Sequence, residues 1–303
     1  MSRSNKKRGL GWIILPALLI AVFAWSLIAG VSLAGQPPAQ VIAHRGACRQ
    51  APENTLPAYE KALELGADGV ECDLLVTADG HVVLSHDETI DRCSSGTGRV
   101  DEMTLAQLRA LDFGGWFSPE FAGTPIPTLD EFLDAVQEAD LILIELKNGE
   151  GDIASKTVQA VQARGLMNKT IFQSFDMEAI QACKAIDENA YVAFLYSGNS
   201  EYDKIIRKNP AAFCEEYNLG GLHPQYAALS SKLVRECAEI GVEIRAWTPN
   251  DTLFLAGSSG QGTRGLITDN IELAQKRLQL PAFARRICGL VCDGVTFFTS
   301  LVG

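Results

Sequence analysis

The sequence predicts an α/β protein whose main part is a (β/α)8 TIM barrel over residues 40–280. Two observations predict this fold. Apolar runs of strand length alternate eight times with stretches of helical periodicity, over a length typical of such barrels. Reactive polar residues also follow the apolar runs, as they do at the C-terminal ends of barrel strands. A doubly wound sheet is the alternative, but no GxGxxG turn follows the first predicted strand.

The predicted strands and helices follow one another in order along this region. The strands are short apolar runs, and they cover residues 40–44, 69–75, 141–146, 169–173, 190–195, 219–223, 242–247 and 264–267. The helices cover residues 54–66, 128–138, 152–164, 176–187, 200–209, 230–240, 250–257 and 270–280. The order breaks at about residues 80–127, where a hairpin turn at Asp79-Gly80, a Gly/Ser-rich loop and an aromatic segment follow the second strand. We expect this small insertion at the mouth of the barrel.

The segment before the barrel predicts a membrane anchor. Residues 1–11 are basic, and residues 12–34 contain no charge, which corresponds to about 34 Å of helix. The basic flank places the start of the chain in the cytoplasm and the barrel outside it, as in a single-pass protein of the cell membrane. A cleaved signal peptide and a secreted protein are the alternative, since Ser32-Leu33-Ala34 resembles a cleavage site. Residues 35–39 form a short linker.

The tail after the barrel, residues 281–303, is mostly apolar. Its charged residues are Arg285, Arg286 and Asp293, and large apolar residues recur at near-helical spacing at Phe283, Ile287, Leu290, Val291 and Phe298. We expect an amphipathic helix at a membrane interface. A helix packed on the barrel is the alternative.

The charge and cysteine content limit the classes of partner. After the basic N-terminus, 22 basic and 37 acidic residues leave a net charge of −15. Such an acidic body argues against nucleic acid as a partner, and an anionic substrate needs local cations to bind. The eight cysteines form no CxxC metal pattern and no regular disulfide spacing. We expect buried thiols, with one unassigned disulfide as the alternative.

Three carboxylates at the ends of two predicted strands indicate a metal site. Glu71 and Asp73 lie two residues apart on one strand, so they share a face, and Glu145 ends the next strand of the barrel. Neighbouring buried carboxylates repel each other and are costly to desolvate without a cation. Carboxylate oxygens suit a hard divalent cation, so the sequence predicts one Ca²⁺ or Mg²⁺ ion.

Basic and histidine residues flank this predicted metal site. Arg45 and Lys147 are placed to hold an anionic group. His44 and His86 offer a general acid and a general base on opposite sides of it. A metal, two cations and two histidines together indicate phosphoryl transfer to water or to an internal hydroxyl.

Further residues near strand ends are candidates for substrate contact. Trp247 ends the seventh predicted strand and is expected to form an aromatic wall for the substrate. His223 ends the sixth and is expected to line the rim, to be hydrogen-bonded or to touch the substrate. Asn54 is expected to cap the helix that begins after Pro52.

Short motifs follow one another in order along residues 40–280. They are His44-Arg45-Gly46, Pro52-Glu53-Asn54-Thr55, Gly66-Ala67-Asp68-Gly69-Val70-Glu71-x-Asp73, Thr77-x-Asp79-Gly80, His86-Asp87, Pro127-Thr128-Leu129, Glu145-Leu146-Lys147, Trp247-Thr248 and Gly265-Leu266-Ile267-Thr268-Asp269. This series closely resembles the glycerophosphodiester phosphodiesterase family. Two positions depart from the family pattern: Asn270 stands where proline is usual, and Pro249 interrupts the usual Trp-Thr-Val-Asn. Both departures affect loop shape at the rim.

The resemblance implies a TIM barrel that hydrolyses glycerophosphodiesters to sn-glycerol 3-phosphate and an alcohol, with a divalent metal that is often calcium. It implies roles for eight residues: metal ligands Glu71, Asp73 and Glu145, catalytic residues His44 and His86, phosphate contacts Arg45 and Lys147, and Glu53 near the metal or the histidines.

Three hypotheses about function follow. The first is an anchored phosphodiesterase that acts on deacylated phospholipids or on polyglycerol phosphates. The second is a lysophospholipase D-like enzyme that acts on intact lysolipids, with which the aromatic insertion is compatible. The third is a catalytically silent protein that binds glycerophosphates.

Overall fold

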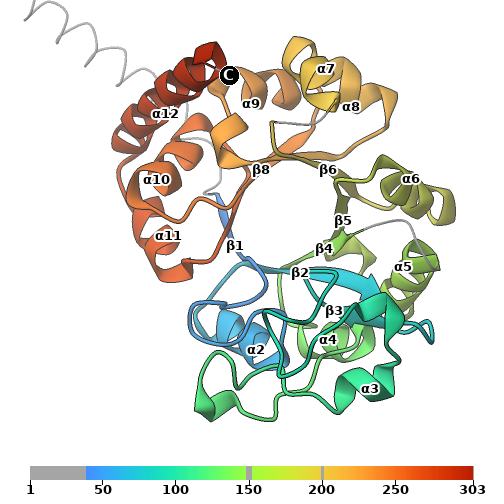
Figure 1. The fold of residues 1–303 in the computed structure, drawn as a ribbon. Coiled ribbons are helices and arrows are strands. Elements are labelled where there is room, and N and C mark those ends of the chain that lie inside the picture. Colours follow the sequence, from blue (N-terminus) through green and yellow to red (C-terminus); the bar gives the residue numbers. More distant parts are fainter. Residues whose placement is uncertain (1–38, 148–151, 199–200, 303) are drawn as a thin grey trace, which may run out of the picture.

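The computed structural model describes residues 39–147, 152–198 and 201–302, and it forms a closed barrel of parallel strands surrounded by helices (Figure 1). The predicted anchor at residues 12–34 lies outside the described residues. The parallel strands are β1 (Gln40–Ala43), β2 (Gly69–Val76), β4 (Leu141–Leu146), β5 (Thr170–Ser174), β6 (Val192–Tyr196), β7 (Gly221–Pro224), β8 (Glu243–Trp247) and β9 (Gly265–Thr268). The sheet closes because β1 pairs with both β2 and β9. This closure confirms the barrel and excludes the doubly wound sheet.

The helices lie on the outside of the barrel (Figure 1). They are α2 (Leu56–Glu64), α3 (Leu105–Arg109), α4 (Leu129–Ala135), α5 (Ile153–Ala163), α6 (Met177–Ile186), α7 (Tyr202–Lys208), α8 (Pro210–Glu216), α9 (Ser231–Ala238), α10 (Thr252–Gln261), α11 (Ile271–Leu278) and α12 (Ala282–Val302). Helix α8 was not predicted. It begins because Pro210 cannot continue α7 and suits the first helical turn, while the Asn209 side chain accepts a hydrogen bond from the Ala212 amide.

The apolar core has two layers that follow from the burial of parallel strands on both faces. All six residues of β4 are buried, as expected when helices cover one face and the barrel interior the other. The larger layer lies between the strands and the helices. The smaller layer fills the barrel interior with Ile42, Leu141, Leu143, Ile171, Ala193 and Ile267. The filled interior leaves the polar residues at the C-terminal strand ends to form the site.

The insertion after β2 is a small unit with its own core. Strand β3 (Val82–Leu84) pairs antiparallel with the end of β2 after a turn in which Gly80 has a φ of +83°. Helix α3 begins with a capping box between Thr104 and Gln107. The apolar core of the insertion consists of Leu75, Val83, Ile90, Val100, Leu108, Phe113 and Ile126. The predicted hairpin is therefore present.

The tail forms the long helix α12, which packs against α10 (Figure 1). Cys292 of α12 is buried in this contact, and Asp293 accepts a hydrogen bond from Gln261 of α10. The alternative prediction of a packed helix is therefore correct for one face of α12. Within the described part of the chain, no helix is both long and apolar enough to cross a membrane.

The eight cysteines are all free thiols in this structure. The buried ones are Cys72, Cys183, Cys214, Cys237 and Cys292. This agrees with the expectation that most of them act as small apolar side chains.

Candidate active site

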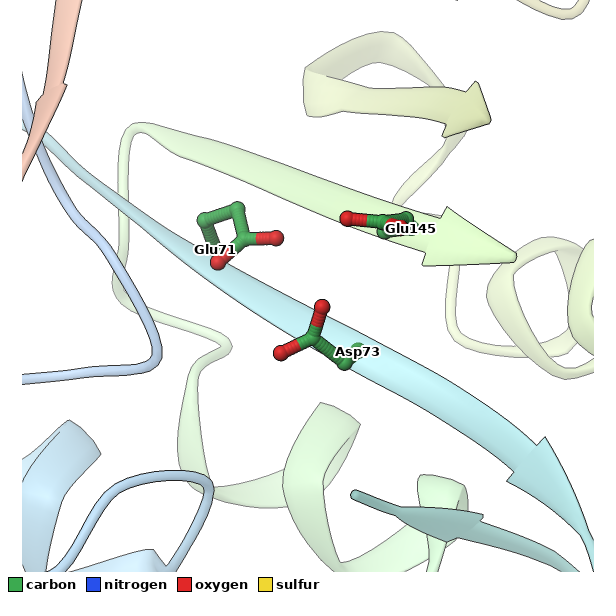
Figure 2. Close-up of side chains that lie close together, drawn as sticks. All are labelled: Glu71, Asp73 and Glu145. Atoms are coloured by element: carbon green, nitrogen blue, oxygen red, sulfur yellow. The ribbon is translucent and has the colours of Figure 1, made fainter. Parts of the chain in front are cut away.

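Three carboxylates converge at the C-terminal ends of β2 and β4, and Figure 2 shows them pointing toward one another. Glu71 and Asp73 share one face of β2, and the parallel register places Asp73 beside Glu145 of β4. Each residue offers an oxygen within 4.8 Å of the others, and all three residues are buried. The three carboxylates that the sequence predicted to be neighbours therefore lie close together in the structure.

The electrostatics of this triad favour a bound cation. Burial, reinforced by Asp73, raises the pKa of Glu145 to about 7, and burial raises that of Glu71 well above its ordinary range. Burial also opposes ionisation of Asp73, but Lys147 and Arg45 outweigh it and lower its pKa. Three buried carboxylates stay ionised together only when a strong positive charge lies between them.

The donor set fits a hard divalent cation. Asp73 Oδ1 is fully buried, and Lys147 Nζ lies 2.7 Å from it as an ion pair. The backbone amide of Arg45 donates to Glu71 Oε2 at 3.0 Å. Arg45 adopts a φ of +55°, a conformation that is costly for a non-glycine residue. This turn directs its amide toward Glu71, so the chain positions a predicted metal ligand through its backbone.

Two cationic side chains adjoin the triad. Lys147 Nζ lies 2.7 Å from Glu145 Oε1, and Arg45 Nε lies 3.4 Å from Asp73 Oδ2. Arg45 also donates to Glu53 Oε1 at 2.9 Å. Both cations line the cavity described below, so they can share their charge with an anionic ligand.

Each predicted catalytic histidine is held by a carboxylate. The Nδ1 atom of His44 lies 2.7 Å from Asp269 Oδ1, and that of His86 lies 2.7 Å from Asp87 Oδ1. Asn250 in turn donates to Asp269 Oδ2 at 2.6 Å. With Nδ1 engaged in both rings, Nε2 is the nitrogen that remains for proton transfer. Burial lowers the pKa of His86, which favours its neutral form.

These groups surround one cavity of about 430 Å³, including its open mouth. The cavity is lined by His44, Arg45, Glu71, His86, Glu145, Lys147, Gln173, Phe175, Leu195, Trp247, Thr248 and Ile267. One wall is aromatic, because Trp247 and Phe175 meet edge to face with their ring centroids 5.5 Å apart. Trp247 lies where the sequence predicted it, whereas Phe175, which is 45% exposed, was not predicted.

His223 has one of its expected roles, the hydrogen-bonded one, and is not among the residues that line the cavity. The structure buries its side chain completely, away from the cavity lining. Its Nδ1 atom lies 2.7 Å from Gln173 Oε1, and Gln173 Nε2 donates to Glu71 Oε1 at 3.3 Å. His223 therefore supports Gln173, and Gln173 orients Glu71. Both point inward because successive residues of β5 and β7 alternate between the barrel interior and the helices.

Asn54 also differs from its prediction, which was a helix cap. The residue that precedes α2 is Thr55, and Asn54 is buried with a φ of +55°. Its amide donates to Asp73 Oδ2 at 2.8 Å, while Tyr59 donates to its carbonyl oxygen at 2.8 Å. The side chain therefore orients a predicted metal ligand. The sequence signal that could have indicated this is the motif Pro52-Glu53-Asn54-Thr55 itself.

Glu53 bridges two arginines beside the histidines. It accepts hydrogen bonds from Arg45 and, through both oxygens, from Arg92, which also donates to Asp87. Arg92 comes from the insertion and was not predicted. A chain of charged contacts therefore joins Arg45, beside the triad, to the carboxylate that holds His86.

The comparison with family models identifies the chain. The model of the glycerophosphoryl diester phosphodiesterase family matches residues 44–273. The chain belongs to this family. It is similar to a glycerophosphodiester phosphodiesterase from Caldanaerobacter subterraneus subsp. tengcongensis, with 35% identity over 236 residues, or 77% of this chain and 94% of the relative. As a member of the glycerophosphodiester phosphodiesterase family, the protein is a phosphoric diester hydrolase.

Solved structures of glycerophosphodiester phosphodiesterases have the same fold. A glycerophosphodiester phosphodiesterase from Agrobacterium tumefaciens superposes with a TM-score of 0.69 at 28% identity, covering 78% of this chain and 99% of that one. A phosphodiesterase from Oleispira antarctica, solved in complex with the product sn-glycerol-3-phosphate, gives a TM-score of 0.69 at 27% identity, covering 80% and 97%.

Replacing Asn54 tests its role beside Asp73. We expect Asn54→Ala to weaken divalent-metal affinity about 10- to 100-fold, because Asp73 loses the amide that orients it. The measurement is a metal titration of activity. Asn218→Ala is the matched control, since Asn218 also has a positive φ (+50°) but is exposed. An equal loss in both variants would contradict the prediction, because it would come from backbone strain alone.

Proposed function

We propose that this protein hydrolyses glycerophosphodiesters to sn-glycerol 3-phosphate and an alcohol, with one Ca²⁺ or Mg²⁺ ion held by Glu71, Asp73 and Glu145. The observation that carries the proposal is the convergence of this triad with two carboxylate-bound histidines in one cavity of a family member. The product complex of the Oleispira antarctica relative supports the glycerol phosphate product. Oxygen ligands support either cation and do not discriminate between them.

The side chains of the cavity have distinct tasks in this reaction. Arg45 and Lys147 bind the phosphodiester oxygens and offset their negative charge. When bound, the divalent cation supplies Lewis-acid charge at the phosphoryl group. One histidine accepts a proton through Nε2 from the attacking oxygen, which is the glycerol hydroxyl next to the phosphate or a water. As the new P–O bond forms and the old one breaks, the other histidine donates a proton to the leaving alkoxide. When the glycerol hydroxyl attacks, the product of this step is a cyclic phosphate, and a water then opens it to sn-glycerol 3-phosphate with the two histidines in reversed roles. Trp247 forms a wall for the glycerol carbons.

The substrate assay follows the release of glycerol 3-phosphate from glycerophosphocholine and glycerophosphoethanolamine. Release of glycerol 3-phosphate with the free alcohol supports the proposal. If neither diester is cleaved while a lysolipid loses choline or ethanolamine and keeps its phosphate, the lysophospholipase D-like function replaces it. The exposed aromatic residues Trp116 and Phe175 favour this second candidate, because they offer apolar contact for an acyl chain. A folded protein that binds metal and cleaves neither class would point to a polyglycerol-phosphate substrate or to a glycerophosphate-binding role.

Replacing Asp269 tests how His44 is positioned. We expect Asp269→Asn to lower kcat about 100-fold with little change in KM, because an amide no longer selects the ring tautomer that leaves Nε2 for proton transfer. Asp187→Asn is the matched control, since Asp187 also accepts a hydrogen bond from a side-chain amide, that of Gln162, but is remote from the cavity. Unchanged kcat in Asp269→Asn would show that His44 needs no carboxylate partner.

We further propose that residues 12–34 anchor the protein in the cell membrane, with the barrel on the extracytoplasmic side. The charge-free length of this segment and its basic flank support the proposal. Mass spectrometry of the mature protein tests it. Recovery of intact residues 1–34 supports the anchor, and a mature N-terminus at about residue 35 supports the secreted alternative.

A further inference from the structure

The outer face of α12 carries an uncovered row of apolar side chains. Phe283, Ile287, Val291 and Val295 follow at four-residue intervals and are each between 41% and 48% exposed. Residues at i and i+4 lie on one face of a helix, so these four form a continuous row, the α12 stripe. They are four of the nine large apolar side chains exposed in the described part of the chain, and the other five come singly from separate segments. Single exposed apolar residues are ordinary, whereas a row requires a partner.

The inner face of α12 fixes the direction of this stripe. Gly257 and Gly260 of α10 and Gly289 of α12 allow the two helix backbones to approach closely. A Cβ atom at Gly260 would lie 1.8 Å from the carbonyl oxygen of Arg285, so no larger residue fits there without moving the helix. Helix α12 is therefore firmly seated, and the stripe must point away from the barrel.

The charged residues of α12 are turned toward the barrel. Arg285 donates to a serine hydroxyl of α10, Arg286 donates to the carbonyl oxygen of Gly260, and Asp293 accepts from the backbone amide of Ser231. The outward face keeps only apolar side chains among the described ones. A helix on the surface of a soluble domain normally directs its charged and polar side chains toward water and its apolar side chains toward the core. The stripe thus has the composition of a buried face in an exposed position.

We propose that the α12 stripe lies on the surface of a lipid bilayer, with the helix parallel to the membrane plane. This proposal rests on the anchor proposed above. The linker at residues 35–39 spans at most about 18 Å, so an anchored barrel stays within that distance of the bilayer. Helix α12 lies on the same side of the barrel as β1, the strand that follows the linker in the sequence (Figure 1). When an uncharged apolar face is held this close to lipid, its entry into the acyl-chain boundary lowers the free energy.

The course of α12 sets the orientation of the barrel on the membrane. Near its start, Arg285 contacts Ser259 at the end of α10, which leads into β9 at the N-terminal face of the barrel. Near its end, Thr296 donates to the carbonyl oxygen of Leu229, which follows β7 on the catalytic face. The stripe therefore runs along the height of the barrel. A barrel resting on it has its axis parallel to the bilayer, and its cavity opens along the membrane surface.

Photocrosslinking in the full chain tests this contact. Val291→p-benzoylphenylalanine is reconstituted into phosphatidylcholine vesicles that contain an alkyne-tagged phosphatidylcholine and is then irradiated. Glu178→p-benzoylphenylalanine on α6 is the matched control, because Glu178 is exposed on another side of the barrel (Figure 1). We expect about tenfold more tagged lipid on the Val291 variant than on the control, because only the stripe enters the acyl-chain boundary.

The outcomes separate the possible occupants of the stripe. A crosslinked dimer of the Val291 variant would assign the stripe to a second copy of the chain, and an internal crosslink to residues 12–34 would assign it to the anchor segment. Either result overturns the proposal, as does equal lipid labelling of the two variants. Vesicle flotation tests the anchor independently. If the chain floats with the vesicles but Val291 carries no tagged lipid, only the proposed lipid contact of the α12 stripe is overturned. If the chain stays in solution, both that contact and the proposed anchor are overturned. Hydrolysis of soluble glycerophosphodiesters reports separately on the proposed function.

Discussion

Chelation of the divalent cation is expected to lower phosphodiesterase activity by about 1,000-fold or more. Without the cation, Arg45 and Lys147 remain engaged with Asp73 and Glu145, so little positive charge is left for the phosphodiester. Loss of this charge stabilisation corresponds to about 4 kcal/mol of the activation barrier. Glycerol 3-phosphate release is measured with EDTA and again after Ca²⁺ or Mg²⁺ is restored in excess. Recovery with only one of the two ions identifies the preferred metal.

A pair of matched variants locates the cation. Glu145 and Glu243 are both strand residues that pair with a cationic residue two positions later, Lys147 and Arg245 respectively. They lie at opposite ends of the barrel, because Glu145 is near the end of β4 and Glu243 begins β8. We expect Glu145→Gln to weaken metal activation at least about 100-fold and Glu243→Gln to leave it unchanged. Full activity in EDTA, or equal effects of the two substitutions, would place the cation elsewhere or remove it from the reaction.

The parts of this site that the sequence predicted are those that local periodicity determines. Glu71 and Asp73 share a face of β2 because side chains alternate along any strand. His44 and Glu145 stand at the C-terminal ends of apolar runs, and barrel topology brings all such ends to one rim. Neither inference needs the details of packing. The barrel, the convergence of the triad and the position of His44 at the rim could therefore be predicted from the sequence.

The residues that support the site could not be predicted in this way. Asn54 and Arg45 both adopt positive φ values, which nothing in their residue types requires, and Asn54 donates to Asp73, 19 positions away in the sequence. His223 ends a strand like a catalytic residue, yet its ring faces Gln173, 50 positions away in the sequence. Such pairings depend on how inward-pointing side chains of different strands fit together. Strand alternation shows that a side chain points inward and does not show what it meets there.

Removal of either histidine proposed to be catalytic is the other substitution with a large expected effect. We expect His44→Ala and His86→Ala each to lower kcat by about 100- to 10,000-fold, because each ring transfers a proton in the proposed reaction. The double variant should lose much less than the product of the two factors, since groups that act together are not additive. His81→Ala is the matched control, because His81 is exposed in the hairpin beside Asp79 and does not line the cavity. Circular dichroism of each variant tests whether it is folded.

A substrate with a good leaving group then distinguishes the acid from the base. Glycerophospho-p-nitrophenol releases a phenolate that needs no proton, so loss of the general acid should matter little with this substrate. Loss of the general base should still lower the rate, because the attacking hydroxyl must be deprotonated whichever group leaves. Burial lowers the pKa of His86 and so favours the neutral ring that a base requires. We therefore expect His44→Ala, and not His86→Ala, to recover activity with this substrate. Recovery of the His86 variant instead would reverse the two roles, and recovery of neither would exclude His44 and His86 as an acid–base pair.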